Sequence, residues 1–286
     1  MWQGLADRIA AALGRRPARL VPLAGGDIGT VTLVEFDDGS RLVAKQPGAH
    51  GTDTAAIEAR MLARLARIPE LPVPAVIHCR PGLLVMEWRP GRRGLAADAE
   101  ADAGRRLACL HAETADRFGY QEETVIGPLP QPNPWHRDWL SFFRDARLLH
   151  MARLAHAAGR LPAATYARIE QLAARLERWI PSRTRPALVH GDLWGGNILC
   201  DRGRLSALLD PALYFGDGEM DLAFLTLFDA PGERFLAAYR ETRPIAPDFF
   251  AVRRSLYLLW PLMVHVRLFG GGYLGQVERI LDRFGV

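Results

Sequence analysis

The chain has 286 residues, of which 49 % are hydrophobic and 24 % charged, with a formal net charge of +4. This is a globular composition, long enough for one large domain or two lobes. No apolar run reaches membrane-spanning length, and the first residues predict an amphipathic helix instead of a secretion signal. We therefore expect a cytoplasmic protein with no membrane partner.

The cysteines and the basic residues exclude two further classes of protein. Cys79, Cys109 and Cys200 are widely separated, odd in number and without the spacing of metal ligands, so neither a disulfide framework nor a zinc site is expected. The arginines alternate with acidic residues along predicted helices, as on solvated helix faces. We expect no nucleic-acid partner, and we favour a monomer while leaving the oligomeric state open.

Three β-strands are predicted near the start of the chain, at residues 20–23, 30–36 and 41–45. The loop between the first two contains Gly25, Gly26 and Gly29. Its backbone N–H groups are candidates to lie over the phosphates of a nucleotide. Its spacing departs from the glycine loop of protein kinases, and a plain hairpin is the alternative interpretation.

The third of these strands ends at Lys45, the only lysine among 36 basic residues. Because arginine carries the positive charge at every other basic position, a lysine here indicates a need for a compact ammonium group. The helix predicted at residues 54–67 carries Glu58, which we expect to hold that ammonium for contact with phosphates. An exposed ion pair within the helix is the alternative for Glu58.

Two more predicted strands, at residues 73–79 and 83–88, complete an N-terminal nucleotide-binding lobe that spans residues 1–88. Residues 89–94 are rich in proline and glycine and are predicted to be a hinge. Residues 95–286 then form a larger, mostly helical catalytic and substrate lobe, with helices expected at 99–115, 135–158, 163–180, 217–228, 249–269 and 273–284. In this arrangement, the residues whose backbone meets adenine are Met86, Glu87 and Trp88, although Met86 is equally well a core residue.

The most informative stretch places Asp192 five residues before Asn197, and Asp210 thirteen residues after that. Residues 198–200 and 205–209 predict a hairpin that returns Asp210 to the side of Asn197. A carboxylate such as Asp192 can take the proton of an acceptor hydroxyl, while Asn197 and Asp210 supply the oxygen ligands that Mg²⁺ prefers. The pattern predicts a kinase-type phosphotransferase that uses ATP and Mg²⁺.

Several motifs resemble the fructosamine-3-kinase (ketosamine-3-kinase) family over nearly the whole chain. They are His190-Gly-Asp-Leu-Trp-Gly-Gly-Asn197, Asp210-Pro-Ala, Gly216-Asp-x-Glu-Met-Asp-Leu-Ala223 and Leu268-Phe-Gly-Gly-Gly-Tyr-Leu274. The resemblance implies an α+β, protein-kinase-like fold with a small N-terminal antiparallel β lobe, which holds one helix, and a larger, mostly helical C-terminal lobe. It also implies ATP-dependent phosphorylation of the sugar 3-hydroxyl of fructosamines or ribulosamines, free or protein-bound, as a deglycation repair activity.

The same resemblance implies a role for each motif residue. Asp192 would be the catalytic base, Asn197 and Asp210 the metal ligands, and Lys45 with Glu58 the phosphate-binding pair. Trp194 and His265 would form walls of the sugar pocket, although a bracing role for Trp194 is nearly as well supported. His190 and Asp221 would support the catalytic loop, with the Asp221 carboxylate accepting backbone N–H groups.

Two alternatives to a ketosamine kinase are kept. His-Gly-Asp-x-x-x-x-Asn also occurs in aminoglycoside and choline kinases, but residues 231–286 hold five acidic residues against eight arginines, which favours a neutral or anionic acceptor over a polycation. A nucleotide-binding pseudokinase would have lost a base, a metal ligand or the lysine, whereas Asp192, Asn197, Asp210 and Lys45 are all present.

Overall fold

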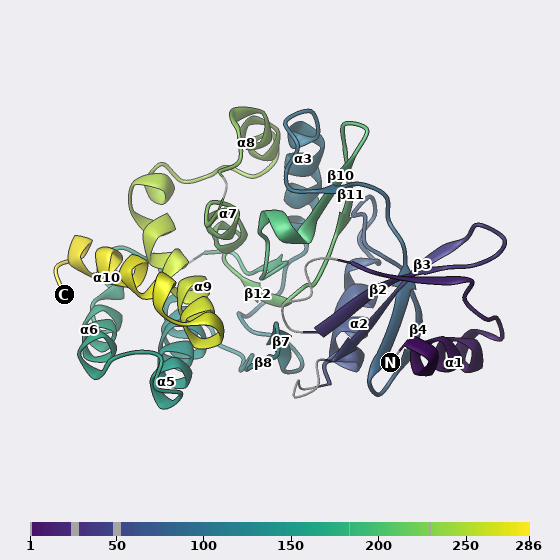
Figure 1. Cartoon of the computed structure of the whole chain (residues 1–286). Helices are drawn as coiled ribbons and strands as arrows, with labels where there is room; N and C mark the ends of the chain where they lie inside the picture. Colours follow the sequence, from purple (N-terminus) through teal and green to yellow (C-terminus); the bar gives the residue numbers. More distant parts are fainter. Residues whose placement is uncertain (1, 24–28, 48–52, 183, 229) are drawn as a thin grey trace.

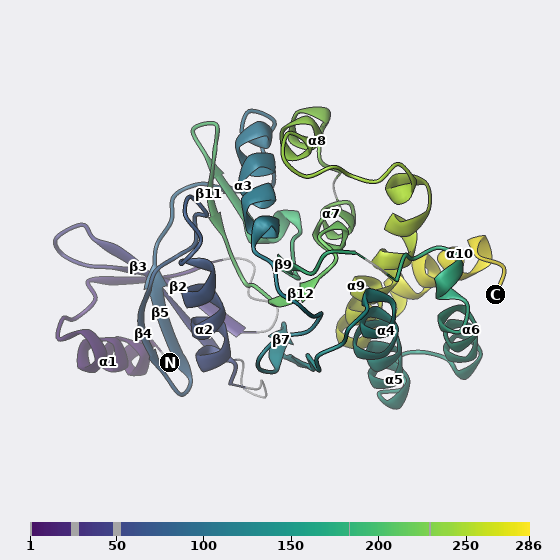
Figure 2. The same cartoon turned by 180° about the vertical axis from the view of Figure 1, so that it is seen from behind.

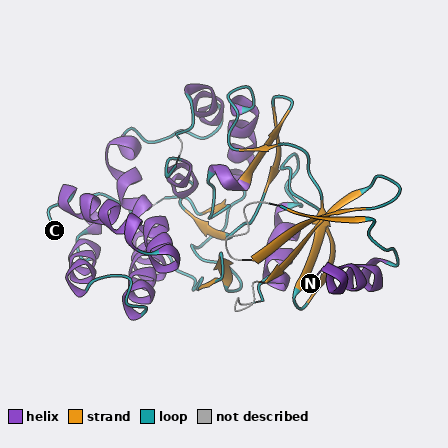
Figure 3. Cartoon of the chain, in the orientation of Figure 1, coloured by secondary structure: helices purple, strands orange, loops and turns teal. Residues whose placement is uncertain are grey.

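The computed structural model describes residues 2–23, 29–47, 53–182, 184–228 and 230–286. A β-rich N-terminal lobe, on the right in Figure 1, adjoins a larger helical lobe on the left. The largest group of strands lies in the N-terminal lobe, and most of the helices lie in the other lobe (Figure 3). This arrangement confirms the predicted α+β class, with the β lobe first in the chain.

The N-terminal lobe is a five-stranded antiparallel sheet with strand order β1-β2-β3-β5-β4. Its strands are β1 (Arg19–Pro22), β2 (Gly29–Glu35), β3 (Arg41–Pro47), β4 (Val76–Arg80) and β5 (Leu83–Glu87). Successive side chains of a strand point to opposite faces, so the sheet has two apolar faces to cover. Helix α1 (Trp2–Leu13) covers one of them, burying Leu5 and Ile9 against Val34, Ala44 and Val85.

Helix α2 (Ala55–Leu65) packs against β3, β4 and β5 in the same lobe and buries Met61, Leu62 and Leu65. These three residues follow the i, i+1, i+4 spacing of one helix face. Glu58 lies one turn earlier than Met61 and Leu62, which directs it toward the end of β3. The same apolar core therefore fixes β3, which carries Lys45, and α2, which carries Glu58, relative to each other.

Residues 89–94, predicted as a hinge, are attached to the C-terminal lobe. Strand β6 (Arg92–Arg93) pairs antiparallel with β10 (Ile198–Asp201), forming the edge of a three-stranded sheet with order β11-β10-β6. The backbone N–H of Gly94 lies 2.9 Å from the carbonyl oxygen of Gly195 and 3.0 Å from that of Ile198. The linker thus lies directly beside the segment that carries Asn197.

The C-terminal lobe packs its helices around a large apolar core that includes Trp139, Phe142, Tyr257 and Trp260. Figure 2 shows α4, α5 and α6 on the side of this lobe away from the sheet. The remaining elements are α3 (Glu100–Ala112), β7 (Thr124–Ile126), β8 (Leu129–Gln131), α4 (Trp139–Phe142), a π-helix (Phe143–Leu149), α5 (His150–Ala157), α6 (Ala163–Ala173), a 3₁₀ turn (Leu176–Arg178), β9 (Ala187–Val189), a 3₁₀ turn (Gly195–Asn197), β11 (Arg204–Leu208), β12 (Tyr214–Gly216), α7 (Glu219–Leu225), α8 (Glu233–Arg240), a π-helix (Phe249–Arg253), α9 (Arg254–Phe269), a 3₁₀ turn (Gly271–Tyr273) and α10 (Leu274–Arg283).

Two predicted helices begin later in the structure than expected, each after an aspartate whose side chain accepts a backbone N–H. The helix expected at 135–158 begins at Trp139, since the Asp138 side chain accepts a hydrogen bond from the Ser141 N–H at 2.8 Å. The helix expected at 217–228 begins at Glu219, whose N–H donates to Asp217 at 3.0 Å. Among the described residues, no helix has both the length and the apolar character needed to cross a membrane.

Candidate active site

The hairpin of β10 and β11 brings Asp210 back to Asn197, as the sequence predicts. Its strands pair antiparallel from Ile198 opposite Leu208 to Asp201 opposite Arg204. Beyond the pair of Ile198 with Leu208, at the open end of the hairpin, the Leu209 N–H donates to the Asn197 carbonyl oxygen at 2.9 Å. Two residues predicted to bind the same metal ion are therefore joined through neighbouring backbone groups.

The backbone around Asp210 is strained and closely supported. Asp210 has a φ of 54°, in the left-handed region that non-glycine residues seldom adopt. The next turn is held by the Ala212 N–H, which donates to the His190 carbonyl at 2.7 Å. Gly191 has a φ of 80°, and a Cβ there would lie 2.1 Å from the Ala212 carbonyl oxygen. Only glycine allows the two segments to approach this closely.

Asp192 and Asn197 are linked by their side chains. The Asn197 Nδ2 donates to both the Oδ2 and the backbone oxygen of Asp192, each at 2.9 Å. This contact assigns the amide nitrogen to the Asp192 side and leaves the Asn197 Oδ1 for another partner. The pair therefore presents a carboxylate and a carboxamide oxygen to the same space.

Lys45 bridges two carboxylates that come from different parts of the chain. Its Nζ lies 2.6 Å from the Glu58 Oε1, and it also donates to the Asp210 Oδ1. Burial opposes the charged ammonium, but the negative charges of Asp210 and Glu58 outweigh it and raise the Lys45 pKa. Burial likewise opposes the ionised Asp210, and the Lys45 ammonium overcomes this and lowers the Asp210 pKa. Lys45 and Asp210 are therefore both charged at neutral pH.

The pKa of Asp192 is shifted upward, opposite to that of Asp210. Burial, followed by the negative charge of Asp210, raises its pKa to about 8, and the hydrogen bond from Asn197 only partly offsets this. A carboxyl with a pKa close to neutral pH is suited to exchange protons with a bound hydroxyl. Asp192 and Asp210 lie close together, but Asp192 is suited to exchange a proton and Asp210 to remain a charged carboxylate.

We expect a corresponding pH dependence. Below pH 8 the raised pKa keeps Asp192 protonated and unable to act as a base, so kcat/KM for the magnesium nucleotide should rise with pH and level off above about 8. Measurement of this profile between pH 6 and 9.5 tests the assignment, because kcat/KM reports the protein before the nucleotide binds. A profile that stays flat throughout this range would contradict it.

Asp221 lies behind the loop that carries His190 and Gly191, at the place that the resemblance implies. It is fully buried, and its carboxylate accepts hydrogen bonds from the His190 N–H at 2.6 Å and the Gly191 N–H at 2.9 Å. The Nε2 of His111 lies 3.1 Å from the same carboxylate, and the His111 Nδ1 lies 2.7 Å from the Tyr239 hydroxyl. His111 is thus a satisfied core histidine that extends this support to helix α8.

Replacement of Asp221 by alanine is expected to destabilise the fold. It leaves two buried backbone N–H groups and the His111 ring without an acceptor, and each unsatisfied group costs about 1–3 kcal/mol. We expect urea denaturation to give a free energy of unfolding lower by about 3 kcal/mol or more. The control is Asp116→Ala at an exposed position, and equal stability of both variants would contradict the supporting role.

Two adjoining cavities meet at these side chains. The larger, of about 420 Å³, is lined by Asp192, Asn197 and Gly29 among others. The smaller, of about 200 Å³, is lined by the residues predicted at the adenine end, Met86, Glu87 and Trp88. Gly25 and Gly26, also predicted to bind nucleotide, lie outside the described residues. The predicted site residues that the structure describes therefore surround the two cavities or support their walls.

An aromatic wall closes the larger cavity at the end away from the sheet. It consists of Trp194, Phe228, His265, Phe269 and Tyr273. Ring centroids lie 5.3 Å apart for Trp194 and Phe228, 5.5 Å for Phe228 and His265, and 4.7 Å for His265 and Tyr273. Trp194 and His265 were predicted here from the resemblance, whereas Phe228, Phe269 and Tyr273 were not predicted as site residues.

The His265 ring is held in one tautomer. Its Nδ1 lies 2.7 Å from the Pro261 carbonyl oxygen, which can only accept, so Nδ1 carries the proton. Burial lowers the His265 pKa and keeps the ring neutral. The Nε2 is therefore a hydrogen-bond acceptor, suited to a sugar hydroxyl.

The donor set fits a magnesium ion. The Asn197 Oδ1 and the second carboxylate oxygen of Asp210, Oδ2, receive no hydrogen bond from the described residues. Both are hard oxygen donors, and Mg²⁺ commonly takes one or two protein ligands, with phosphates and water completing its shell. No group of three or more His, Cys, Asp or Glu side chains among the described residues could hold a metal by itself.

Comparison with known proteins now identifies the family. The model of the family described as fructosamine kinase matches residues 1–285. The chain belongs to the fructosamine kinase family. This fructosamine kinase family member is 33 % identical over 293 residues to a Synechocystis protein named a probable ketoamine kinase, covering 99 % of this chain and 96 % of that protein. It is 30 % identical to the chloroplastic protein-ribulosamine 3-kinase of Arabidopsis thaliana, covering 92 % and 81 % of the two chains.

Solved structures agree with this membership of the fructosamine kinase family. A crystal structure from Thermobifida fusca, described as that of a fructosamine-3-kinase, has a TM-score of 0.85 and 32 % identity over 98 % of both chains. The aminoglycoside phosphotransferase APH(4)-Ia in complex with AMP-PNP and hygromycin B has a TM-score of 0.68 at 15 % identity, a likeness of fold alone. The predicted kinase-like fold and the family resemblance are both confirmed.

Proposed function

We propose that this fructosamine kinase family member transfers the γ-phosphoryl group of ATP to the sugar 3-hydroxyl of a ketosamine. The observation that carries the proposal is the meeting of Lys45, Asp192, Asn197 and Asp210 at one cavity, in a chain that the family model matches along its length. The ketoamine kinase and ribulosamine 3-kinase relatives support this acceptor class. We place the activity in the cytoplasm, on free or protein-bound ketosamines.

In the proposed reaction, Asp192 accepts the proton of the attacking 3-hydroxyl. Asn197 and Asp210 would hold Mg²⁺, which offsets the charge of the phosphates when it is bound. Lys45, kept in place by Glu58, would contact the same phosphates as a point charge. The protein thus supplies position and charge, which are the main requirements of phosphoryl transfer.

We assign the adenine end to the smaller cavity, with residues 89–94 as the hinge between lobes. Met86 and Leu62 give it apolar lining beside the backbone of Glu87 and Trp88. We assign the acceptor to the larger cavity, where the Trp194 face offers a surface for sugar C–H groups and the His265 Nε2 accepts a hydroxyl. The two ends would be joined by the phosphates.

The charges that line the acceptor end of the larger cavity argue against an aminoglycoside acceptor. The acidic residues that line the larger cavity are Asp53, Glu58, Asp192 and Asp210, and the aromatic wall contains none. A polycationic acceptor would need several carboxylates on its own side of the cavity. An uncharged sugar against aromatic rings matches this lining better.

A turnover assay with purified protein tests the proposal. ADP release should depend on a fructosamine or ribulosamine, and NMR of the product should place the phosphate on the 3-oxygen. Kanamycin-like amines are the comparison acceptors. Turnover of those amines in preference to the ketosamines would overturn the acceptor class, and an absence of any ADP release would overturn the kinase activity.

A further inference from the structure

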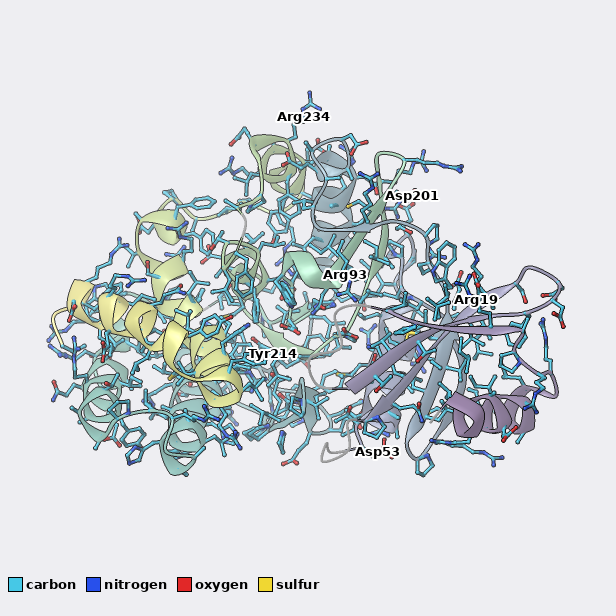
Figure 4. All side chains as sticks on the ribbon, in the orientation of Figure 1. Arg19, Asp53, Arg93, Asp201, Tyr214 and Arg234 are labelled. Carbon is cyan, nitrogen blue, oxygen red and sulfur yellow. The ribbon has the colours of Figure 1, made fainter. Side chains whose placement is uncertain are left out.

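Arg93 is a site residue that neither the sequence nor the proposed function accounts for. It belongs to strand β6, where it pairs with Leu199, two residues after Asn197. Figure 4 labels it near the middle of the molecule, between the sheet and the helical lobe. Its guanidinium donates a hydrogen bond from Nη1 to the Gly196 carbonyl, within the turn that carries Asn197.

The two cavities share only a few residues, and these mark their junction. Five residues line both of them: Val31, Lys45, Glu58, Arg93 and Asp210. If adenine occupies the smaller cavity and the acceptor the larger, the phosphates that join them must cross this junction. Arg93 therefore lies where the phosphates would pass, in the same junction as Lys45.

The basic side chains that line the two cavities differ in whether a carboxylate pairs with them. Lys45 is already bound to two carboxylates, Glu58 and Asp210. Arg89, which lines the smaller cavity, pairs with Glu87 at 2.9 Å. Of the Lys and Arg side chains lining the two cavities, Arg93 alone has no carboxylate within 4.0 Å among the described residues. Burial opposes the ionised Asp210, and the Arg93 charge joins that of Lys45 in lowering the Asp210 pKa. No direct ion pair with a described residue holds Arg93, so it can still contact an anion.

The guanidinium also has donors to spare. Arginine carries five N–H donors, and the bond to Gly196 uses one of them. The remaining donors match the spacing of phosphate oxygens, which arginine binds in a bidentate way. The bond to Gly196 fixes the side chain beside the Asn197 turn, which lowers the entropy cost of binding.

We propose that Arg93 binds the phosphates of the nucleotide, as a second cation beside Lys45. This inference rests on the proposed function, because it takes ATP as the nucleotide. It assigns Arg93 two contacts, one with the phosphates and one with the turn that positions Asn197.

Binding measurements on Arg93→Met and Arg93→Lys test this proposal without relying on turnover. Isothermal titration calorimetry with MgATP, MgADP and adenosine separates phosphate contacts from base contacts. For Arg93→Met we expect the Kd of MgATP to rise at least tenfold and that of MgADP to rise as well, while the Kd of adenosine changes less than twofold. Arg93→Lys keeps the charge but not the planar fork, so it should recover only part of the MgATP affinity.

The control is Arg92→Met, the neighbouring residue on β6, which is exposed and lines neither cavity. Its affinities should equal those of the unchanged protein. A structural role through the Asn197 turn would weaken nucleotide binding only when Mg²⁺ is present, whereas a direct phosphate contact also weakens ATP binding in EDTA. An unchanged Kd for ATP in EDTA, or an equal loss for adenosine and MgATP, would overturn the proposal. An unchanged MgATP affinity with a raised KM for the ketosamine would overturn it too. Failure of the unchanged protein to bind MgATP would instead overturn the proposed function.

Discussion

Replacement of Asp192 by asparagine is expected to lower kcat for a ketosamine by roughly 10²–10⁴-fold, the usual contribution of a positioned general base. The substitution keeps the shape of the side chain and its place beside Asn197, but removes the proton acceptor. Affinity for MgATP should stay within about threefold, because in the proposed function Asp192 contacts the acceptor while Asn197 and Asp210 hold the metal. The loss should therefore fall on kcat and leave nucleotide binding in place.

Steady-state kinetics with the ketosamine, together with calorimetric titration of MgATP, measure the two effects separately. Asp201→Asn is a matched control, since Asp201 lies on the same hairpin and makes only a 3.8 Å pair with Arg202. It should retain full activity. If Asp192→Asn lost MgATP affinity in proportion to kcat, Asp192 would be a ligand of the nucleotide and not the base.

Replacement of Lys45 by methionine should reduce both nucleotide affinity and rate, each by at least tenfold and kcat/KM by about 10²–10³-fold, the scale on which one preorganised charge contact acts. Methionine keeps the apolar stem but leaves Glu58 and Asp210 facing each other without a cation. Their repulsion would also disturb Asp210, the proposed metal ligand. The effect on nucleotide binding separates this variant from the Asp192 variant.

Lys45→Arg is the more discriminating change at this position. The ammonium lies within hydrogen-bonding distance of two carboxylates that come from α2 and from the end of β11. A planar guanidinium is larger and directs its donors differently, so it should not restore both contacts. We expect kcat/KM for MgATP to stay at least tenfold below that of the unchanged protein. Full activity of Lys45→Arg would show that charge alone suffices there.

The parts of the site that the sequence predicts are those set by local chain geometry. The hairpin that joins Asn197 to Asp210 follows from two short apolar strands around a tight turn, and its pairing is present in the structure. The contact of Lys45 with Glu58 follows from a strand and the helix after it. Both need little knowledge of how distant segments pack.

The parts that were missed depend on distant segments. Arg93 lies in a segment predicted as a linker, and its place in the site depends on the pairing of β6 with β10 about a hundred residues later. Tyr239 meets His111 because α3 and α8 pack together, and His111 in turn meets Asp221 of α7. The three-residue strands β7, β8, β9 and β12 are too short to show alternation. The triple glycine between Phe269 and Tyr273 was the one sequence feature that could have indicated that these two residues lie at a site.

A crystal structure of the protein with Mg²⁺ and the non-hydrolysable nucleotide AMP-PNP tests the central claim most directly. The account predicts a metal ion bound by the Asn197 Oδ1 and an Asp210 oxygen, the Lys45 ammonium in contact with the phosphates, and the γ-phosphate facing Asp192. A nucleotide bound with its phosphates away from Lys45, or a metal ion that contacts neither Asn197 nor Asp210, would contradict it.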